Sequence, residues 1–76
     1  MPRFFFHNRN QDQTYLDPEG SDLPDLAAAM AEVTRSAREM MADELRRGPL
    51  TPGRSFNIVS DDGAVLATIA FHDCLY

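Results

Sequence analysis

The longest regular pattern of apolar and polar positions runs from Asp22 to Gly48. Apolar side chains recur there at spacings of three and four residues, at Leu26, Met30, Val33, Ala37, Met40, Met41 and Leu45. Most charged side chains of the segment fall on the opposite side of a helical wheel. A period near 3.6 residues predicts one long amphipathic helix that buries a single stripe.

Both ends of this helix carry their own signals. Asp22 suits the N-cap, with Ser21 as the alternative, and Pro24 then falls in the first turn, where its missing N–H costs nothing. At the other end, Gly48 fits the residue after the helix and Pro49 prevents its continuation. The sequence therefore predicts a helix whose limits are set locally.

Strands are predicted before the helix. Residues 3–7 are rich in phenylalanine, and strand alternation places Phe4 and Phe6 on one face and Phe5 and His7 on the other. A polar segment, 8–13, separates this strand from a short one at 14–17. The two strands should form a hairpin, and a turn at 17–20 leads into the helix.

Two further strands are predicted after the helix, at 54–60 and 64–71, joined by a turn at Asp61-Asp62-Gly63. Alternation in the second strand places Val65, Ala67, Ile69 and Phe71 on one face, and Leu66, Thr68 and Ala70 on the other. The tail at 72–76 is short, and Leu75 and Tyr76 are expected to pack back on the domain.

The element order is thus β-β-α-β-β, within a single domain spanning residues 1–76. The economical architecture for this order is an α+β fold. It consists of one antiparallel sheet with a single long helix packed across one face.

Charge and composition limit the partners. The net charge is −5, and all seven basic residues are arginines, so nucleic acid is disfavoured, although a local arginine patch could still contact phosphate. Charges interrupt the helical stripe at every turn, so a membrane span is not expected. A single cysteine, Cys74, and the lack of a visible export signal indicate a cytoplasmic protein.

The opening Met1-Pro2-Arg3-Phe4-Phe5-Phe6-His7 resembles that of a family of small bacterial proteins with a domain of unknown function. The chain continues with Asp17-Pro18-Glu19-Gly20, Leu23-Pro24-Asp25-Leu26 and Asp61-Asp62-Gly63, in the order typical of that family. It departs from the pattern at 8–13, which lacks the Asp-Gly that the family often has. The resemblance implies a fold and a compartment but no reaction.

A weaker similarity connects the chain to antitoxin domains of the HicB type. These also run strand, strand, helix, with Pro-Asp-Leu near the helix start, as at Leu23-Pro24-Asp25-Leu26. An antitoxin-like regulator that binds a protein partner, and nucleic acid as an oligomer, is therefore the alternative function.

No residue pattern predicts catalysis. The candidates for a metal or nucleophile site are His7, His72, Asp73 and Cys74, but three consecutive ligand types do not suit one tetrahedral metal centre. We therefore expect no enzyme activity, no cofactor and no metal. Arg46 and Arg47 could contact an anion, although compensation of the helix dipole is the simpler account of both.

The phenylalanine run is the strongest functional signal, because one helix covers only one face of a sheet. We expect Phe4 and Phe6 to meet the helix, with the reverse assignment as the alternative, and either arrangement leaves apolar side chains on the uncovered face. Such faces usually mark an interface, here assigned to Phe5, His7 and Phe71. The sequence thus predicts a small non-enzymatic interaction module that forms a homodimer or binds another protein.

Overall fold

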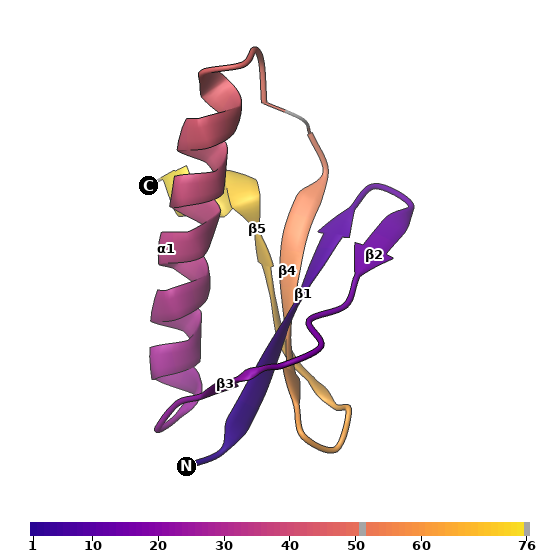
Figure 1. The fold of residues 1–76 in the computed structure, drawn as a ribbon, viewed down its shortest axis with the longest axis vertical. Coiled ribbons are helices and arrows are strands. Elements are labelled where there is room, and N and C mark those ends of the chain that lie inside the picture. Colours follow the sequence, from indigo (N-terminus) through magenta and orange to yellow (C-terminus); the bar gives the residue numbers. More distant parts are fainter. Residues whose placement is uncertain (51, 76) are drawn as a thin grey trace.

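The computed structural model describes residues 1–50 and 52–75, apart from the side chain of Leu75. The prediction that Leu75 and Tyr76 pack back on the domain therefore concerns side chains outside the described part. Figure 1 shows one long helix lying alongside a twisted antiparallel sheet. The elements are β1 (Arg3–Asn10), β2 (Gln13–Tyr15), β3 (Ser21–Asp22), α1 (Leu26–Leu45), β4 (Arg54–Ser60), β5 (Val65–Ala70) and the 3-10 helix η1 (Phe71–Leu75). The predicted α+β class is confirmed.

The strand order of the sheet is β2-β1-β4-β5, and β3 also pairs with β1. Because β4 occupies one edge of β1 along its length, β2 and β3 share the other edge, at residues 8–10 and 3–4. The two-residue strand β3 has no periodic pattern of its own and was not predicted.

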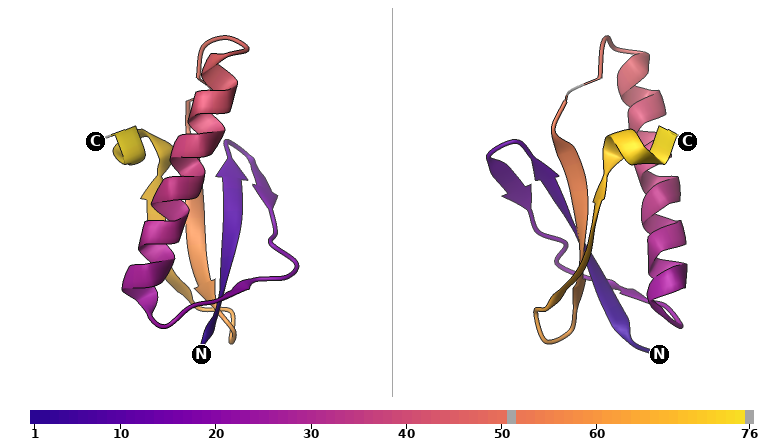
Figure 2. Two further views of the ribbon diagram at one scale, coloured as in Figure 1. Left: turned by 60° about the vertical axis from the view of Figure 1, so that its left-hand side comes forward. Right: turned by 180° about the vertical axis from the view of Figure 1, so that it is seen from behind.

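The core lies between α1 and one face of the sheet, as the two views in Figure 2 show. The helix buries Ala29, Val33, Ala37 and Met41, and three of these side chains are small enough to bring its axis close to the sheet. Phe4, Phe56 and Ile58 meet them from the strands, and Phe6 packs against this cluster. The prediction that Phe4 and Phe6 face the helix is confirmed.

The helix starts later than predicted. Its N-cap is Asp25, whose Oδ1 accepts the N–H of Ala28 at 2.8 Å. Asp22 was the wrong cap because its carboxylate binds Arg3 and its backbone belongs to β3. The residue before a proline also avoids the helical region, so Pro24 holds Leu23 outside the helix. At the other end α1 stops at Leu45, with Arg46 as the C-cap.

A β-bulge changes the faces of β5. Ile58 pairs with Ala67, but the next residue, Val59, pairs with Val65, so Leu66 is the additional residue. Val65 therefore points to the face away from the helix. The prediction that it shares a face with Ala67 and Ile69 is wrong.

The end of β5 also differs from the prediction. The strand stops at Ala70, and Phe71 starts η1, which turns over the end of the core. Phe71 and Cys74 are buried there. The Nε of Arg38 donates to the carbonyl oxygen of Cys74 at 2.7 Å, which ties η1 to the helix.

Candidate interaction surface

The sheet face opposite α1 is built of side-chain rows that cross β1, β4 and β5. One row, here called the apolar row, consists of Phe5, Val59 and Val65. The next, the polar row, consists of His7, Asn57 and Thr68, and the hydroxyl of Thr68 donates to Oδ1 of Asn57 at 2.9 Å. The uncovered face is thus apolar in one row only, close to the β4–β5 turn.

Exposure varies along the apolar row. Val65 is 59% exposed, Phe5 is half-buried and Val59 is 7% exposed. Gly20 contributes to the cover of Phe5, because a Cβ atom added at Gly20 would lie 2.9 Å from Cε1 of Phe5. The segment between β2 and β3 therefore packs against one end of the row, and Val65 forms its open end.

Asp17 holds that segment in place. Its Oδ2 accepts the N–H of Phe6, and its Oδ1 accepts the N–H groups of Glu19 and Gly20, each at 3.2 Å. Partial burial raises the pKa of Asp17, but the three N–H donors and the neighbouring His7 outweigh it and keep this pKa below its usual value. The backbone N–H of Asp17 in turn donates to Nδ1 of His7 at 3.0 Å.

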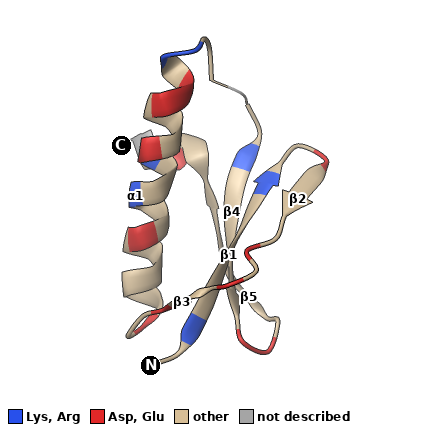
Figure 3. Cartoon of the chain, viewed as in Figure 1, with Lys and Arg blue, Asp and Glu red and all other residues tan. Residues whose placement is uncertain are grey.

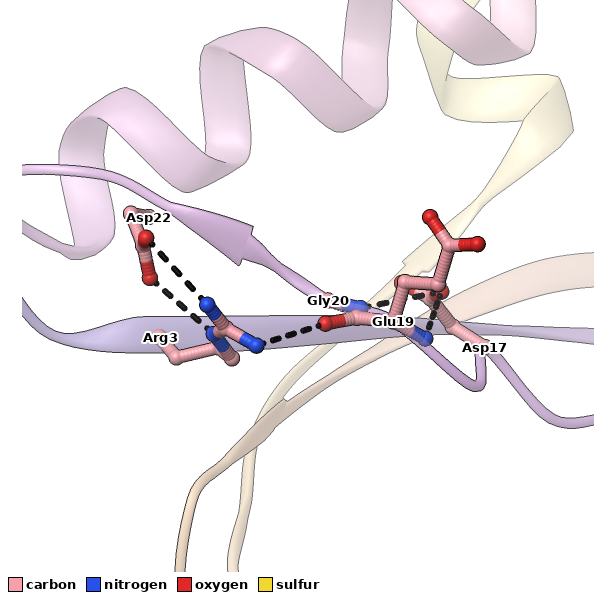
Figure 4. A network of polar contacts seen from close by, with 5 residues as sticks. All are labelled: Arg3, Asp17, Glu19, Gly20 and Asp22. Atoms are coloured by element: carbon pink, nitrogen blue, oxygen red, sulfur yellow. Dashed lines mark hydrogen bonds and ion pairs between the residues drawn. The ribbon is translucent and has the colours of Figure 1, made fainter.

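Arg3 fixes the far end of the same segment (Figure 4). Its Nε and Nη2 donate to the two carboxylate oxygens of Asp22 at 3.0 and 3.3 Å, and its Nη1 donates to the carbonyl oxygen of Glu19 at 3.2 Å. Hydrogen bonding and charge attraction within this pair raise the pKa of Arg3 and lower that of Asp22. The network is structural, since it fastens residues 17–22 to the edge of β1.

The three residues predicted for the interface do not all lie on the uncovered face. Phe5 and His7 lie on the uncovered face as predicted, with ring centroids 6.3 Å apart. Phe71 does not, because it is 4% exposed and stacks on Phe56 at 5.1 Å. The guanidinium of Arg54 lies 4.6 Å from the Phe71 ring centre. The prediction that Phe71 lies on the open surface is therefore wrong, and Phe71 belongs to the core.

The predicted anion contacts, Arg46 and Arg47, lie just beyond the last turn of α1. Both are exposed, and Arg47 pairs with Asp43 at 3.1 Å. Figure 3 shows acidic and basic residues along the helix, whereas β1 and β4 carry only basic ones and the acidic residues outside the helix lie mainly in the connecting segments. Of the two arginines, Arg47 thus already has an acidic partner.

A cavity of about 290 Å³ lies where the C-terminal end of α1 meets β4 and η1. Its walls include Met41, Leu50 and Phe71, its charged groups are Glu44 and Arg54, and the candidate residue His72 also lines it. These two side chains form an ion pair in which they are 24% and 12% exposed. The charges that line this cavity therefore neutralise each other.

The other candidate ligands lie apart. His7 is on β1 and His72 follows β5, and β4 separates these two strands. Within residues 1–50 and 52–75, no three His, Cys, Asp or Glu side chains are grouped so that they could hold a metal ion. No helix in the same part of the chain is long and apolar enough to cross a membrane.

Sequence reasoning missed Val59, Val65 and Asp17. The bulge that redirects Val65 leaves no pattern in the sequence, whereas Asp17-Pro18-Glu19-Gly20 is a recognisable turn motif in which an aspartate accepts N–H groups from the residues that follow. The motif could have identified Asp17 as an anchor, but not its partner on β1.

The fold and this surface define a small two-layer α+β protein in which no element of the described residues forms a layer over one face of the sheet. A family model matches residues 3–72, and the chain belongs to that family, described as a domain of unknown function (DUF6894). No curated protein and no solved structure shows a significant match to the chain.

Proposed function

We propose that this protein is a non-enzymatic module that acts by protein–protein contact, in the first place by self-association. The observation that carries the proposal is the apolar row on the uncovered sheet face, which ends in Val65 at 59% exposure. A valine at that exposure gains free energy when a partner covers it, at roughly 25 cal/mol for each Å² of apolar surface removed from water.

The size of the protein supports the same proposal. A chain of 76 residues buries only about 60% of the surface that its unfolded form exposes, so its core is small. Large apolar side chains remain exposed on several elements, among them Tyr15, Leu16, Met30, Leu45, Val65 and Leu66. Contact with a second molecule would cover part of this surface and add to the stability of the fold.

The polar groups near the surface favour a binding role over a catalytic one. Nδ1 of His7 and the carboxylate of Asp17 are occupied by backbone N–H groups, and the charges of the cavity pair with each other. A general base needs a free lone pair within reach of its substrate. The free, buried Cys74 suits the reducing cytoplasm of a bacterium, where we place the protein.

Antitoxin-like regulation, with contact to nucleic acid, is the second candidate. Binding to phosphates needs arginines that are available to them. At least four of the seven arginines have acidic partners, in the pairs Arg3–Asp22, Arg35–Glu32, Arg47–Asp43 and Arg54–Glu44. The charge arrangement therefore favours the first proposal.

The test is the solution mass, measured by light scattering over a concentration series. We expect a dimer that dissociates on dilution. The variant Val65→Asp, at the open end of the apolar row, should weaken it while helical circular dichroism persists, and Tyr15→Asp serves as the matched control. Tyr15 is 54% exposed and pairs opposite Asn8, which points to the other face. A monomer at every concentration, with no partner captured, would refute the proposal.

A further inference from the structure

The two edges of the sheet differ in how they are closed. On the β1 side, β2 and β3 pair with the two ends of β1, and the Asp17 carboxylate accepts the Phe6 N–H between them. On the other side, β5 pairs with β4 alone among the strands of the described residues. One edge is thus closed by the chain itself, and the other presents backbone donors and acceptors.

The open edge is unusual in composition. β5 has six residues, Val65–Ala70, without a charged side chain or a proline. Natural edge strands are normally protected from pairing by lysine, inward-pointing charge or proline. The bulge at Leu66 interrupts only one end of the strand, so the remaining stretch from Ala67 is regular and unprotected.

The side of α1 that faces η1, the element directly after β5, carries one charged residue, Arg38. At 100° per residue, the positions 27, 31, 34, 38, 42 and 45 form one stripe along the helix. Its members are Ala27, Ala31, Thr34, Arg38, Ala42 and Leu45. Arg38 is bonded to the backbone of η1, the element that directly follows β5, so the stripe lies on the β5 side of the helix.

Four other charged residues of the helix lie on another side. Glu32, Arg35, Glu39 and Asp43 form ion pairs among themselves and with Arg47. On the β5 side, β5 itself is uncharged, and the titratable groups next to it are Arg38 on α1 and His72 and Asp73 on η1.

The absence of charge along β5 allows a second copy to pair there without bringing acidic side chains of the two strands together. Each copy carries a net charge of −5, so two copies repel unless their contact avoids acidic side chains. We propose that a second copy of this chain docks on β5 through antiparallel β5–β5 pairing about a two-fold axis. The proposal rests on the self-association proposed above, and it specifies the surface.

The geometry of such a dimer follows from symmetry. A strand that pairs with its own copy across a two-fold axis perpendicular to the sheet is antiparallel, and its central residue meets itself. The middle of β5 lies at Ala67 and Thr68, so neighbouring threonines would meet near the axis, an arrangement that is favourable in antiparallel pairs. The two sheets then become continuous, with both helices on the same face.

A pair of matched lysine variants tests this proposal. Thr68→Lys introduces a charge at an exposed position in the middle of β5, and Thr14→Lys introduces the same charge at an exposed position of β2 on the opposite edge. We expect Thr68→Lys to weaken the dimer about tenfold or more, because like charges meet across the axis. Thr14→Lys should leave the dimer unchanged, and circular dichroism should show native helix in both.

Amide hydrogen exchange at two protein concentrations gives an independent reading. The outward-pointing N–H groups of β5 should exchange more slowly at the higher concentration, because pairing protects them, while the N–H groups of β2 should not change. A dimer that persists in Thr68→Lys, with unchanged exchange in β5, would overturn this proposal but leave self-association in place. A monomer at every concentration would overturn both.

Discussion

The carboxylate of Asp17 accepts the backbone N–H of Phe6 at 3.2 Å, across the gap between β2 and β3. A strand edge presents N–H and C=O groups that need partners. Between the residues of β1 that pair with β2 and β3, the partner of the Phe6 N–H is a side chain and not a strand. The same carboxylate holds the turn that follows it, through Glu19 and Gly20.

Replacement of Asp17 by alanine should therefore destabilise the protein more than a typical surface substitution. The change removes the acceptor for three N–H groups, two of them half-buried. Because an unsatisfied, partly buried donor costs free energy, we expect a loss of about 1–3 kcal/mol in the free energy of unfolding. Urea denaturation measures this loss of stability. A loss equal to that of the exposed control Asp12→Ala would contradict the role of Asp17 as an acceptor for these N–H groups.

The same carboxylate should also give stability that depends on pH. Its pKa is lower in the folded protein than its usual value of 3.8. The contribution is thus fully present above the unfolded pKa and is lost as the pH falls through the folded pKa. The difference in unfolding free energy between the wild type and Asp17→Asn should shrink as the pH drops below about 4. Comparing these two proteins cancels the contributions of the other acidic groups. A difference that stays constant with pH would contradict a lowered pKa of Asp17.

Gly20 should not tolerate a side chain. Its φ is +73°, and a Cβ atom would lie 2.9 Å from Cγ of Arg3 and Cε1 of Phe5. Gly63 has a φ of +87° but open space around it. Gly63→Ala should therefore lower the free energy of unfolding by about 1 kcal/mol, because only its positive φ is unfavourable for alanine. Gly20→Ala should lower it clearly more. Thermal unfolding of both variants checks this, and equal losses would show that Arg3 and Phe5 move aside easily.

The sequence was sufficient for the parts of the fold that depend on periodicity. The stripe through Val33 and Ala37 identified the helix and the centre of its buried side, although Met30 and Leu45 of the predicted stripe are exposed. Alternation placed Phe4 and Phe6 on one face of β1 but left open which face the helix covers. Both patterns work because each side chain direction follows from the backbone geometry alone. The fold class was therefore predictable.

The candidate surface was only partly predictable, because it depends on contacts between segments distant in sequence. Phe5 and His7 were placed by alternation. Val65 reached the same face through a bulge, and Phe71 left the strand because it stacks on Phe56. Neither a bulge nor the end of a strand is determined by local propensity when tertiary packing competes with it.

Ile58 should be the most sensitive position of the sheet. It is fully buried at the centre of β4, between α1 and the neighbouring strands. Ile58→Ala should lower the free energy of unfolding by about 2–5 kcal/mol, through lost burial and a cavity. Val65→Ala, on the exposed end of β5, should change it by less than about 0.5 kcal/mol in the monomer. Chemical denaturation at low protein concentration separates this effect from any effect on association.

The two aspartates at the start of the helix should behave differently, although they are three residues apart and both fit the sequence pattern of a cap. Asp25 caps α1 through the N–H of Ala28, and Asp22 binds Arg3. Asp25→Ala should cost about 1 kcal/mol and reduce the helical circular dichroism near the transition, because a first-turn N–H loses its acceptor. Asp22→Ala breaks an exposed ion pair and should leave the helix signal unchanged. If Asp22→Ala removed helix content and Asp25→Ala did not, the helix would begin where the sequence alone places it, and the pairing of β3 with β1 would be wrong.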